Sequence, residues 1–154
     1  TFLQNTTVYS NLSLVKSVVS FLDNSSAYVS PLQGQSPYII NAGIIHENYT
    51  TGWSYSVAVN RSGERLAFVG ANPIKAPYRA DVYEQPRTVI DLQIAKNIGK
   101  FNIKATWGDV LHQDLKFTQE GTATTATNEV VNYKNELFVY KMPWTFTLSA
   151  GVQF

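Results

Sequence analysis

The chain has 154 residues and a formal net charge of +1, with 44% hydrophobic residues, 13% aromatic residues and no cysteine. The near-zero charge gives no indication of nucleic acid or of an acidic partner, and the lack of cysteine excludes disulfide bonds and thiol chemistry. The mean hydropathy is −0.13 and no apolar run approaches the ~20 residues of a spanning helix, which excludes a helical membrane protein.

The first half of the chain predicts three extended segments. The first runs from about 8 to 21, and a loop punctuated by Asn, Ser, Pro and Gly follows it. The second covers 37–47, and a short polar turn leads to the third, Trp53–Asn60. In this third segment aromatic and aliphatic residues alternate with serine, alanine and asparagine, which is typical of a β-strand with one apolar face.

Three more segments follow a connection at about 70–87 that contains three prolines. The fourth, Ile90–Ala95, and the fifth, Phe101–Gly108, alternate clearly and flank a tight turn in which Gly99 can supply a positive φ. The polar stretch from about 112 to 136 is expected to be a loop, and the last segment is 138–154.

This last segment carries the clearest pattern in the chain. Every second residue of the final seventeen is apolar or aromatic, and the residues between them are mostly small or polar. The apolar set is Phe138, Tyr140, Met142, Trp144, Phe146, Leu148, Ala150, Val152 and Phe154. The pattern predicts one long strand with aromatic residues at both ends of its apolar face, as in transmembrane β-barrels, where apolar side chains face lipid and polar ones face the lumen.

The connections between the six segments alternate long, short, long, short, long. Bacterial outer membrane barrels have short periplasmic turns and long extracellular loops. We therefore expect an all-β, antiparallel up-and-down meander of about six long strands, part of a large transmembrane β-barrel, with both short turns and Phe154 at the periplasmic side. The predicted lipid-facing residues are Tyr38, Ile40, Trp53, Tyr55, Val57, Ile90, Leu92, Ile94, Phe101, Ile103, Trp107, Trp144, Phe146, Leu148 and Phe154.

A soluble or surface-attached β-sandwich that acts as a binding module is the alternative interpretation. Its strands would also alternate and form hairpins, but a sandwich has no reason to place its long loops at one end and its short loops at the other.

Several pieces of the sequence resemble a known family. These are "NLSLVKS" at 11–17, "LQGQSPYIINAGI" at 32–44, "VNRSGERL" at 59–66, "VYEQPRTVIDLQIAK" at 82–96 and the aromatic-ended last strand. In order and spacing they are similar to TonB-dependent outer membrane receptors, in particular those that often carry a carboxypeptidase-regulatory-like domain at the N-terminus. The resemblance covers nearly the whole chain and matches the final strands of a barrel of about twenty-two strands.

This resemblance implies a section, residues 1–154, of a receptor that imports a substrate across the outer membrane of a Gram-negative bacterium. The plug domain and the TonB-contacting segment are expected to lie outside this sequence, in a longer chain or a separate polypeptide, because six strands are fewer than the about eight that close a barrel. The implied partners are the remaining barrel and plug, outer membrane lipid, the TonB complex and the barrel assembly machinery, and no nucleic acid. A porin or a secretion-assembly barrel, neither of which transports through TonB, remains an alternative.

Polar residues in phase with each other predict the lumenal face. Asn60, Asp91, Gln93 and Lys104 are expected to face the lumen, where such side chains usually hydrogen-bond to a plug or to each other. Glu84 and Arg87, which flank Pro86, are predicted to form an ion pair at the corner between loop and strand, and the family resemblance also implies a structural role there.

The final strand has a second predicted role. Outer membrane barrels are recognised by their assembly machinery through a C-terminal strand that alternates and ends in an aromatic residue, and "TFTLSAGVQF" resembles that signal. The residues concerned are Trp144, Phe146, Leu148, Val152 and Phe154, which also fit an interfacial aromatic girdle. Deletion of Phe154 is predicted to lower the assembled amount, whereas Gln153→Ser should have little effect.

Catalysis and cofactor binding have no support in the sequence. His46 and His112 lie far apart without a carboxylate or cysteine cluster at ligand spacing, so we predict no metal site and no cofactor. Asp109, His112 and Asp114 are close in sequence, but no serine in a nucleophile-elbow context accompanies them.

Overall fold

The computed structural model describes residues 2–23, 26–70, 80–124 and 129–152. Within these ranges a short 3-10 helix, η1 (Phe2–Asn5), precedes twelve strands, and there is no helix long and apolar enough to cross a bilayer. The strands are β1 (Thr6–Leu14), β2 (Val19–Asp23), β3 (Ser26–Ser30), β4 (Tyr38–Asn48), β5 (Trp53–Ser62), β6 (Arg65–Phe68), β7 (Val82–Glu84), β8 (Arg87–Ile98), β9 (Phe101–Gly108), β10 (Leu115–Thr124), β11 (Val130–Tyr140) and β12 (Thr145–Val152).

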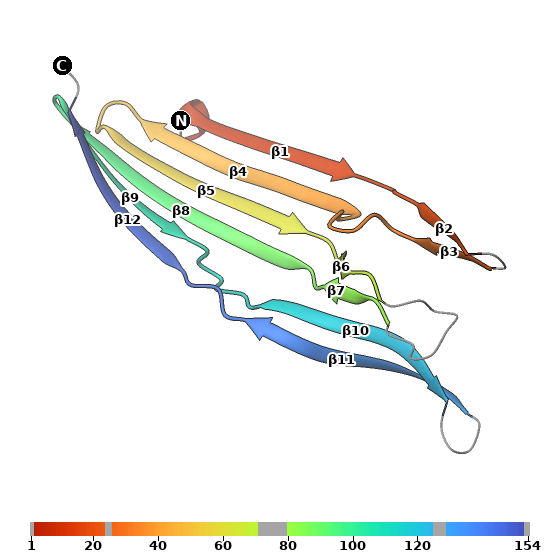
Figure 1. Cartoon of the computed structure of the whole chain (residues 1–154). Coiled ribbons are helices and arrows are strands. Elements are labelled where there is room, and N and C mark those ends of the chain that lie inside the picture. Colours follow the sequence, from red (N-terminus) through yellow and green to blue (C-terminus); the bar gives the residue numbers. More distant parts are fainter. Residues whose placement is uncertain (1, 24–25, 71–79, 125–128, 153–154) are drawn as a thin grey trace.

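The largest unit is a six-stranded antiparallel sheet in the order β1-β4-β5-β8-β9-β12. Its strands lie side by side in one long, curved layer (Figure 1). The all-β class and the antiparallel arrangement predicted from the sequence are thus confirmed, and the sheet's strands follow each other in chain order. Trp53 at the start of β5 is opposite Lys96 near the end of β8, so both short turns lie at the same end of the sheet, as predicted.

The two short turns contact each other. The amide of Asn97 donates a hydrogen bond to the carbonyl of Gly52 over 2.8 Å. Gly52 has φ +73°, and a Cβ there would lie 2.6 Å from the Asn97 carbonyl oxygen, so no other residue fits without a shift. Gly99 has the predicted positive φ, +58°, in the two-residue connection between β8 and β9. Two short turns in contact with each other therefore form this end of the sheet. Strand β1 also begins there, and β12 ends there.

The long connections contain further strands at the opposite end of the sheet. One connection holds the pair β2–β3, and the other two contribute β6, β7, β10 and β11 to a four-stranded sheet in the order β11-β10-β7-β6 (Figure 1). The predicted loop at 112–136 is therefore wrong, because most of it forms the hairpin β10–β11. The predicted first segment is divided into β1 and β2, and β3 lies in the predicted loop after it.

The prediction of one long final strand is also wrong. Residues 141–144 separate β11 from β12, and Pro143, which has no N–H to donate, lies in this gap. Pro86 lies in the corresponding gap between β7 and β8. Between β9 and β10 the chain bends at Asp109 and His112, whose φ values are +53° and +49°. These interruptions mark one line across the molecule, where the six-stranded sheet ends and the extensions begin.

The few buried apolar side chains lie mostly in the extensions. Leu66 in β6 is 1% exposed and Phe117 in β10 is 8% exposed, while Ala95 is the buried apolar residue among those described in the six-stranded sheet. Phe117 packs against Phe138 in a tilted arrangement with ring centroids 4.6 Å apart, and Phe68 and Tyr140 complete this aromatic cluster. The six-stranded sheet therefore has no interior of its own.

Candidate functional site

One face of the six-stranded sheet is apolar across all six strands. Residues that are directly opposite in neighbouring strands point to the same face. The register places six apolar side chains in a single row: Val8, Ile44, Val57, Leu92, Trp107 and Phe146. Adjacent rows on this face add Ile40, Ile90, Ile94, Ile103 and Leu148. The predicted common face of the apolar residues within the strands is thus confirmed.

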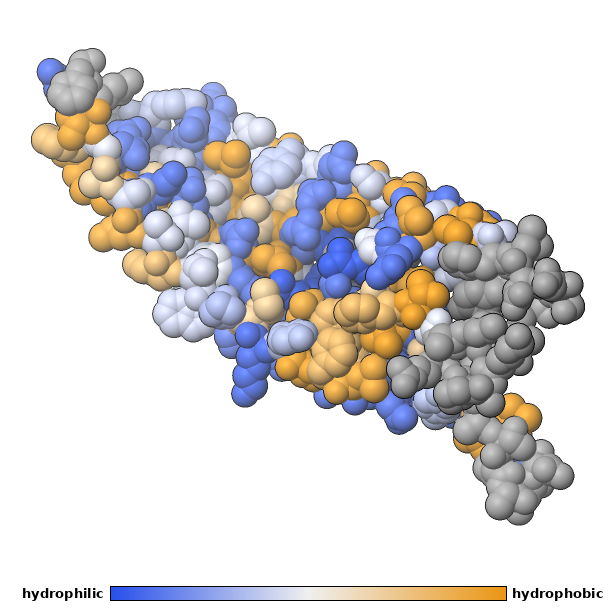
Figure 2. Space-filling view, viewed as in Figure 1, coloured by the Kyte–Doolittle hydropathy of each residue, from blue (hydrophilic) through white to orange (hydrophobic). Residues whose placement is uncertain are grey.

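This apolar face is not covered. Val8 is 72% exposed, Phe146 is 60% exposed and Trp107 is 44% exposed. Figure 2 shows the sheet from its other side, where hydrophilic side chains cover much of the middle and hydrophobic ones appear at the β12 edge and around the four-stranded sheet. An exposed apolar surface that continues over six strands is far larger than a soluble monomer normally shows, and it indicates an apolar environment or partner.

Polar and aromatic side chains border the apolar face at both ends. At the turn end, Trp53 stacks on Tyr55 with centroids 6.0 Å apart, and the Lys96 ammonium lies 4.7 Å from the Trp53 ring centre. At the other end, Arg61 donates a hydrogen bond to Thr88 over 2.8 Å. Trp107, in the central row, contacts Trp144 edge to face at 6.4 Å. The sequence analysis missed Lys96 and Arg61, although both are in phase with the apolar residues at the ends of the alternation.

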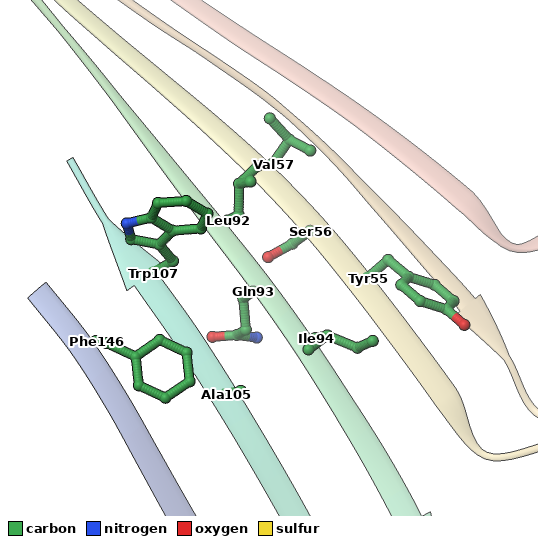
Figure 3. A pocket seen from close by; sticks show the side chains of 9 residues that line it. All are labelled: Tyr55, Ser56, Val57, Leu92, Gln93, Ile94, Ala105, Trp107 and Phe146. Carbon is green, nitrogen blue, oxygen red and sulfur yellow. The ribbon is translucent and has the colours of Figure 1, made fainter. Parts of the chain in front are cut away.

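A shallow groove crosses the apolar face near its centre. It has a volume of about 360 Å³ and is lined by nine residues of β5, β8, β9 and β12 (Figure 3). Ala105 is the smallest side chain in a row that also contains Tyr55, Ile94 and Leu148, so it leaves space between the larger neighbours Trp107 and Phe146.

The opposite face of the sheet is polar. Asn60, Asp91, Gln93 and Lys104, which the sequence predicts on one face, do share it. The Asn60 amide donates to Asn41 over 2.5 Å, and Asp91 accepts a hydrogen bond from the amide of Asp109 over 2.8 Å. These contacts are within the sheet or with the bend at its end, so they stabilise the sheet without the help of other elements.

The predicted ion pair between Glu84 and Arg87 is wrong. Glu84 accepts two hydrogen bonds from Arg65, each 2.8 Å long, across the β6–β7 pair. Arg87 instead pairs with Asp109 and donates to the carbonyl of Gln113 over 3.1 Å. Both residues do stabilise the corner, but each binds a partner on a neighbouring strand or bend. Strand pairing brings Arg65 next to Glu84 and Asp109 next to Arg87, whereas Glu84 and Arg87 point to different partners on either side of Pro86.

The residues predicted for assembly and for the girdle lie along β12 and in the gap before it. Phe146, Leu148 and Val152 are 60%, 69% and 50% exposed on the apolar face. Trp144 lies in the gap, against Trp107. Phe154 and Gln153 lie outside the described residues. The edge of β12 that faces away from β9 has no strand partner among the described residues, and the same holds for the outer edge of β1.

Titratable groups on the sheet are few and dispersed. In the described part of the chain no three His, Asp or Glu side chains lie close enough to hold a metal ion. His46 shares a 2.8 Å hydrogen bond with the Thr6 hydroxyl and stacks on Tyr55. In the exposed turn beside it, a hydrogen bond to Glu47 raises the pKa of the Tyr49 phenol.

Comparison with known proteins identifies no relative of this chain, since no family model, no curated protein and no solved structure matches it.

Proposed function

We propose that this chain forms six adjacent membrane-spanning strands in the wall of a large outer membrane β-barrel that belongs to a TonB-dependent receptor. The observation that carries the proposal is the row of apolar side chains that continues through all six strands and is exposed on one face only. Apolar-out, polar-in alternation of this kind is what a barrel wall requires.

The dimensions of the sheet support this proposal. Its strands have between 8 and 12 residues, near the about 9–11 residues of a tilted transmembrane strand. From Trp53 to Arg61, the two side chains that border the apolar rows of β5, there are eight residue steps, which is about 27 Å along the strand and about 20 Å in height at a tilt of about 40°. The apolar band of outer membrane barrels is about 25 Å tall.

The polarity of the two ends supports the same interpretation. Trp53 and Tyr55 are at the level where an aromatic girdle forms, and Lys96 and Arg61 lie just beyond the apolar rows. Amphipathic aromatic rings and long cationic side chains both favour the boundary between hydrocarbon and headgroups. In this arrangement the two tight turns lie at the periplasmic side and the four-stranded sheet extends outward from the cell.

A β-sandwich fits the sheet less well. A sandwich needs a second sheet that packs about 10 Å from the apolar face. The four-stranded sheet extends away from the end of the six-stranded sheet (Figure 1), and β12 and β1 have unpaired outer edges among the described residues. In hydrocarbon such edges must be paired, and we propose that other strands of the same barrel pair with them.

Accessibility measurements along β8 test the membrane assignment. Single nitroxide labels at positions 90–95 of the full-length protein in lipid vesicles should alternate. Labels at Ile90, Leu92 and Ile94 should be accessible to oxygen dissolved in lipid, and labels at Asp91 and Gln93 to a water-soluble nickel reagent. Protection of Ile90, Leu92 and Ile94 from both reagents, with Asp91 and Gln93 still accessible to the nickel reagent, would support the sandwich instead.

The transport part of the proposal rests on the family resemblance and needs its own test. The full-length protein, purified in detergent, should bind the periplasmic domain of TonB, and the binding should depend on a segment that precedes the barrel. A protein that spans the membrane but does not bind TonB would be a porin or a secretion-assembly barrel.

A further inference from the structure

The groove on the apolar face continues toward a second, more polar hollow. The second hollow has a volume of about 540 Å³, lies at the turn end and is lined by His46, Asn48, Thr51, Trp53 and Tyr55. Tyr55 lines both hollows, so they adjoin at this residue. Together they form a path from the centre of the apolar face to its polar border.

The two hollows differ in the chemistry that they offer. Around Ala105 the lining is apolar, with Trp107, Phe146 and Ile94 as walls. The hollow at the turn end offers the Asn48 amide and the rings of Trp53 and Tyr55. A ligand that fills both must be apolar along one part and polar at one end.

A cation lies beside the polar hollow. Lys96 contacts two residues of its lining, because its ammonium donates to the carbonyl of Thr51 and lies over the Trp53 ring. An ammonium has three N–H donors, so an anionic oxygen can bind here as well. Lys96 is two residues along β8 from Ile94, about 7 Å at the rise of a strand, which places the charge just beyond the apolar groove.

We propose that this path is a binding site for one phospholipid of the membrane leaflet at the turn end, with an acyl chain in the groove at Ala105 and the phosphate beside Lys96. The inference rests on the proposed function, because only a sheet that spans a membrane presents this face to lipid. A phosphate at the border of the hydrocarbon accepts charge-assisted hydrogen bonds, and aromatic rings at the same level hold the glycerol region. Most lipid around a barrel exchanges freely, whereas the lipid at this groove is held at both ends.

Lipid binding to the full-length protein tests the site. The protein is freed of lipid in mild detergent, titrated with dipalmitoyl phosphatidylglycerol and analysed by native mass spectrometry. The unmodified protein should hold one lipid per chain. Ala105→Leu, which fills the groove, and Lys96→Gln, which removes the cation, should each weaken this binding at least five-fold. Inorganic phosphate at the same concentration should not compete, since it cannot use the groove.

Two matched controls separate the site from general lipid contact. Ala150→Leu adds the same atoms on the same face, in β12, at a position that does not line the groove. Lys104→Gln removes one charge from the opposite face. Both variants should bind lipid like the unmodified protein. Absence of a retained lipid, or equal weakening in all four variants, would overturn the proposed site. Nitroxide alternation along β8 would still stand in that case, so the two proposals can fail separately.

Discussion

The two main sheets of this chain are stabilised in different ways. In the four-stranded sheet, buried Leu66 and Phe117 are combined with cross-strand ion pairs, such as Arg65 with Glu84 at 2.7 Å. In the six-stranded sheet large apolar side chains remain exposed, and the described residues have regular pairing with no interruption of register within a strand pair. The four-stranded sheet has such shifts at Phe117/Thr118 and at Leu66/Phe68.

We propose that this difference reflects two different surroundings for one chain. Regular pairing satisfies every inner backbone group, which is essential where no water can replace a missing hydrogen bond. Bulges are tolerated where water reaches the backbone, because water can hydrogen-bond to the groups that a bulge leaves unpaired. The interruptions at Pro86, Asp109 and Pro143 lie between the six-stranded and the four-stranded sheet, and we propose that they mark the outer boundary of the membrane.

A charge on the apolar face gives the largest expected effect. Leu92→Arg should destabilise the full-length protein in lipid vesicles by about 2–4 kcal/mol, because arginine near the middle of a bilayer has that cost on the lipid face of a barrel. Gln93→Arg, one residue along on the polar face, should change the free energy of unfolding much less. Urea unfolding in vesicles measures both. Equal effects of the two substitutions would show that the faces do not differ in environment.

Removal of the buried leucine should destabilise the four-stranded sheet and leave the six-stranded sheet unchanged. Leu66→Ala should destabilise the four-stranded sheet by about 2–3 kcal/mol, since it creates a cavity under a side chain that is 1% exposed. Ile94→Ala removes the same number of carbon atoms from the apolar face, where lipid or detergent can fill the space. Hydrogen exchange resolved by peptide should show faster exchange in β6 and β7 for Leu66→Ala only. Faster exchange throughout both sheets would mean that they unfold as one unit.

The alternation of the sequence predicted the faces of the six-stranded sheet but not its ends. The strands β5, β8 and β9 were predicted correctly because apolar residues alternate with small or polar ones over most of each strand, and that pattern is local. The final strand was predicted too long, because Tyr140, Met142 and Trp144 continue the same alternation through Pro143. Alternation reports which side a residue faces. It does not report that the hydrogen-bond partner changes from β10 to β9.

Contacts between distant strands account for the other errors. The hairpin β10–β11 has a polar, low-complexity sequence, and its pairing depends on cross-strand contacts such as Phe117 with Phe138 and Lys134 with Glu120. Glu84 and Arg87 seemed matched by their proximity in sequence, whereas Arg65 and Asp109 lie opposite them in space. Such partners become visible only when the register is known.

The ion pair at the corner should have a moderate effect. The side chains of Arg87 and Asp109 are only 16% and 12% exposed, so Arg87→Met leaves a largely buried carboxylate without its cation. We expect a loss of about 2 kcal/mol, below the cost for a fully buried pair. Lys116→Met removes the exposed pair with Glu136, in which both side chains are about half exposed, and should cost about 0–1 kcal/mol. Equilibrium unfolding that ranks the two variants in the reverse order would contradict this assignment.

The smallest expected effect is the pH dependence of the hairpin β10–β11. A hydrogen bond to Glu120, directly opposite in the strand pair, raises the pKa of Lys134 above its ordinary value of 10.5, and burial opposes this only partly. A pKa that is higher in the folded state means that folding favours the protonated amine. The stabilisation is therefore complete below about pH 10.5 and is lost as the pH rises through the folded-state pKa. Because both side chains are more than a third exposed, solvent screening limits the contribution to below about 1 kcal/mol.

Titration of the lysine side chains by NMR measures this coupling directly. In the full-length protein, the pH midpoint at which the Lys134 Cε resonance shifts should lie above that of the unfolded chain. Glu120→Gln should lower this midpoint. The control is Thr118→Ser, which leaves the Glu120 carboxylate in place and should not change the Lys134 midpoint. An unchanged Lys134 midpoint in Glu120→Gln would show that the contact does not persist in solution. The stability of the four-stranded sheet would then depend on Leu66, Phe117 and the Arg65–Glu84 pair. The charged side chains of β10 and β11 would interact mainly with water and contribute little to the stability of the sheet.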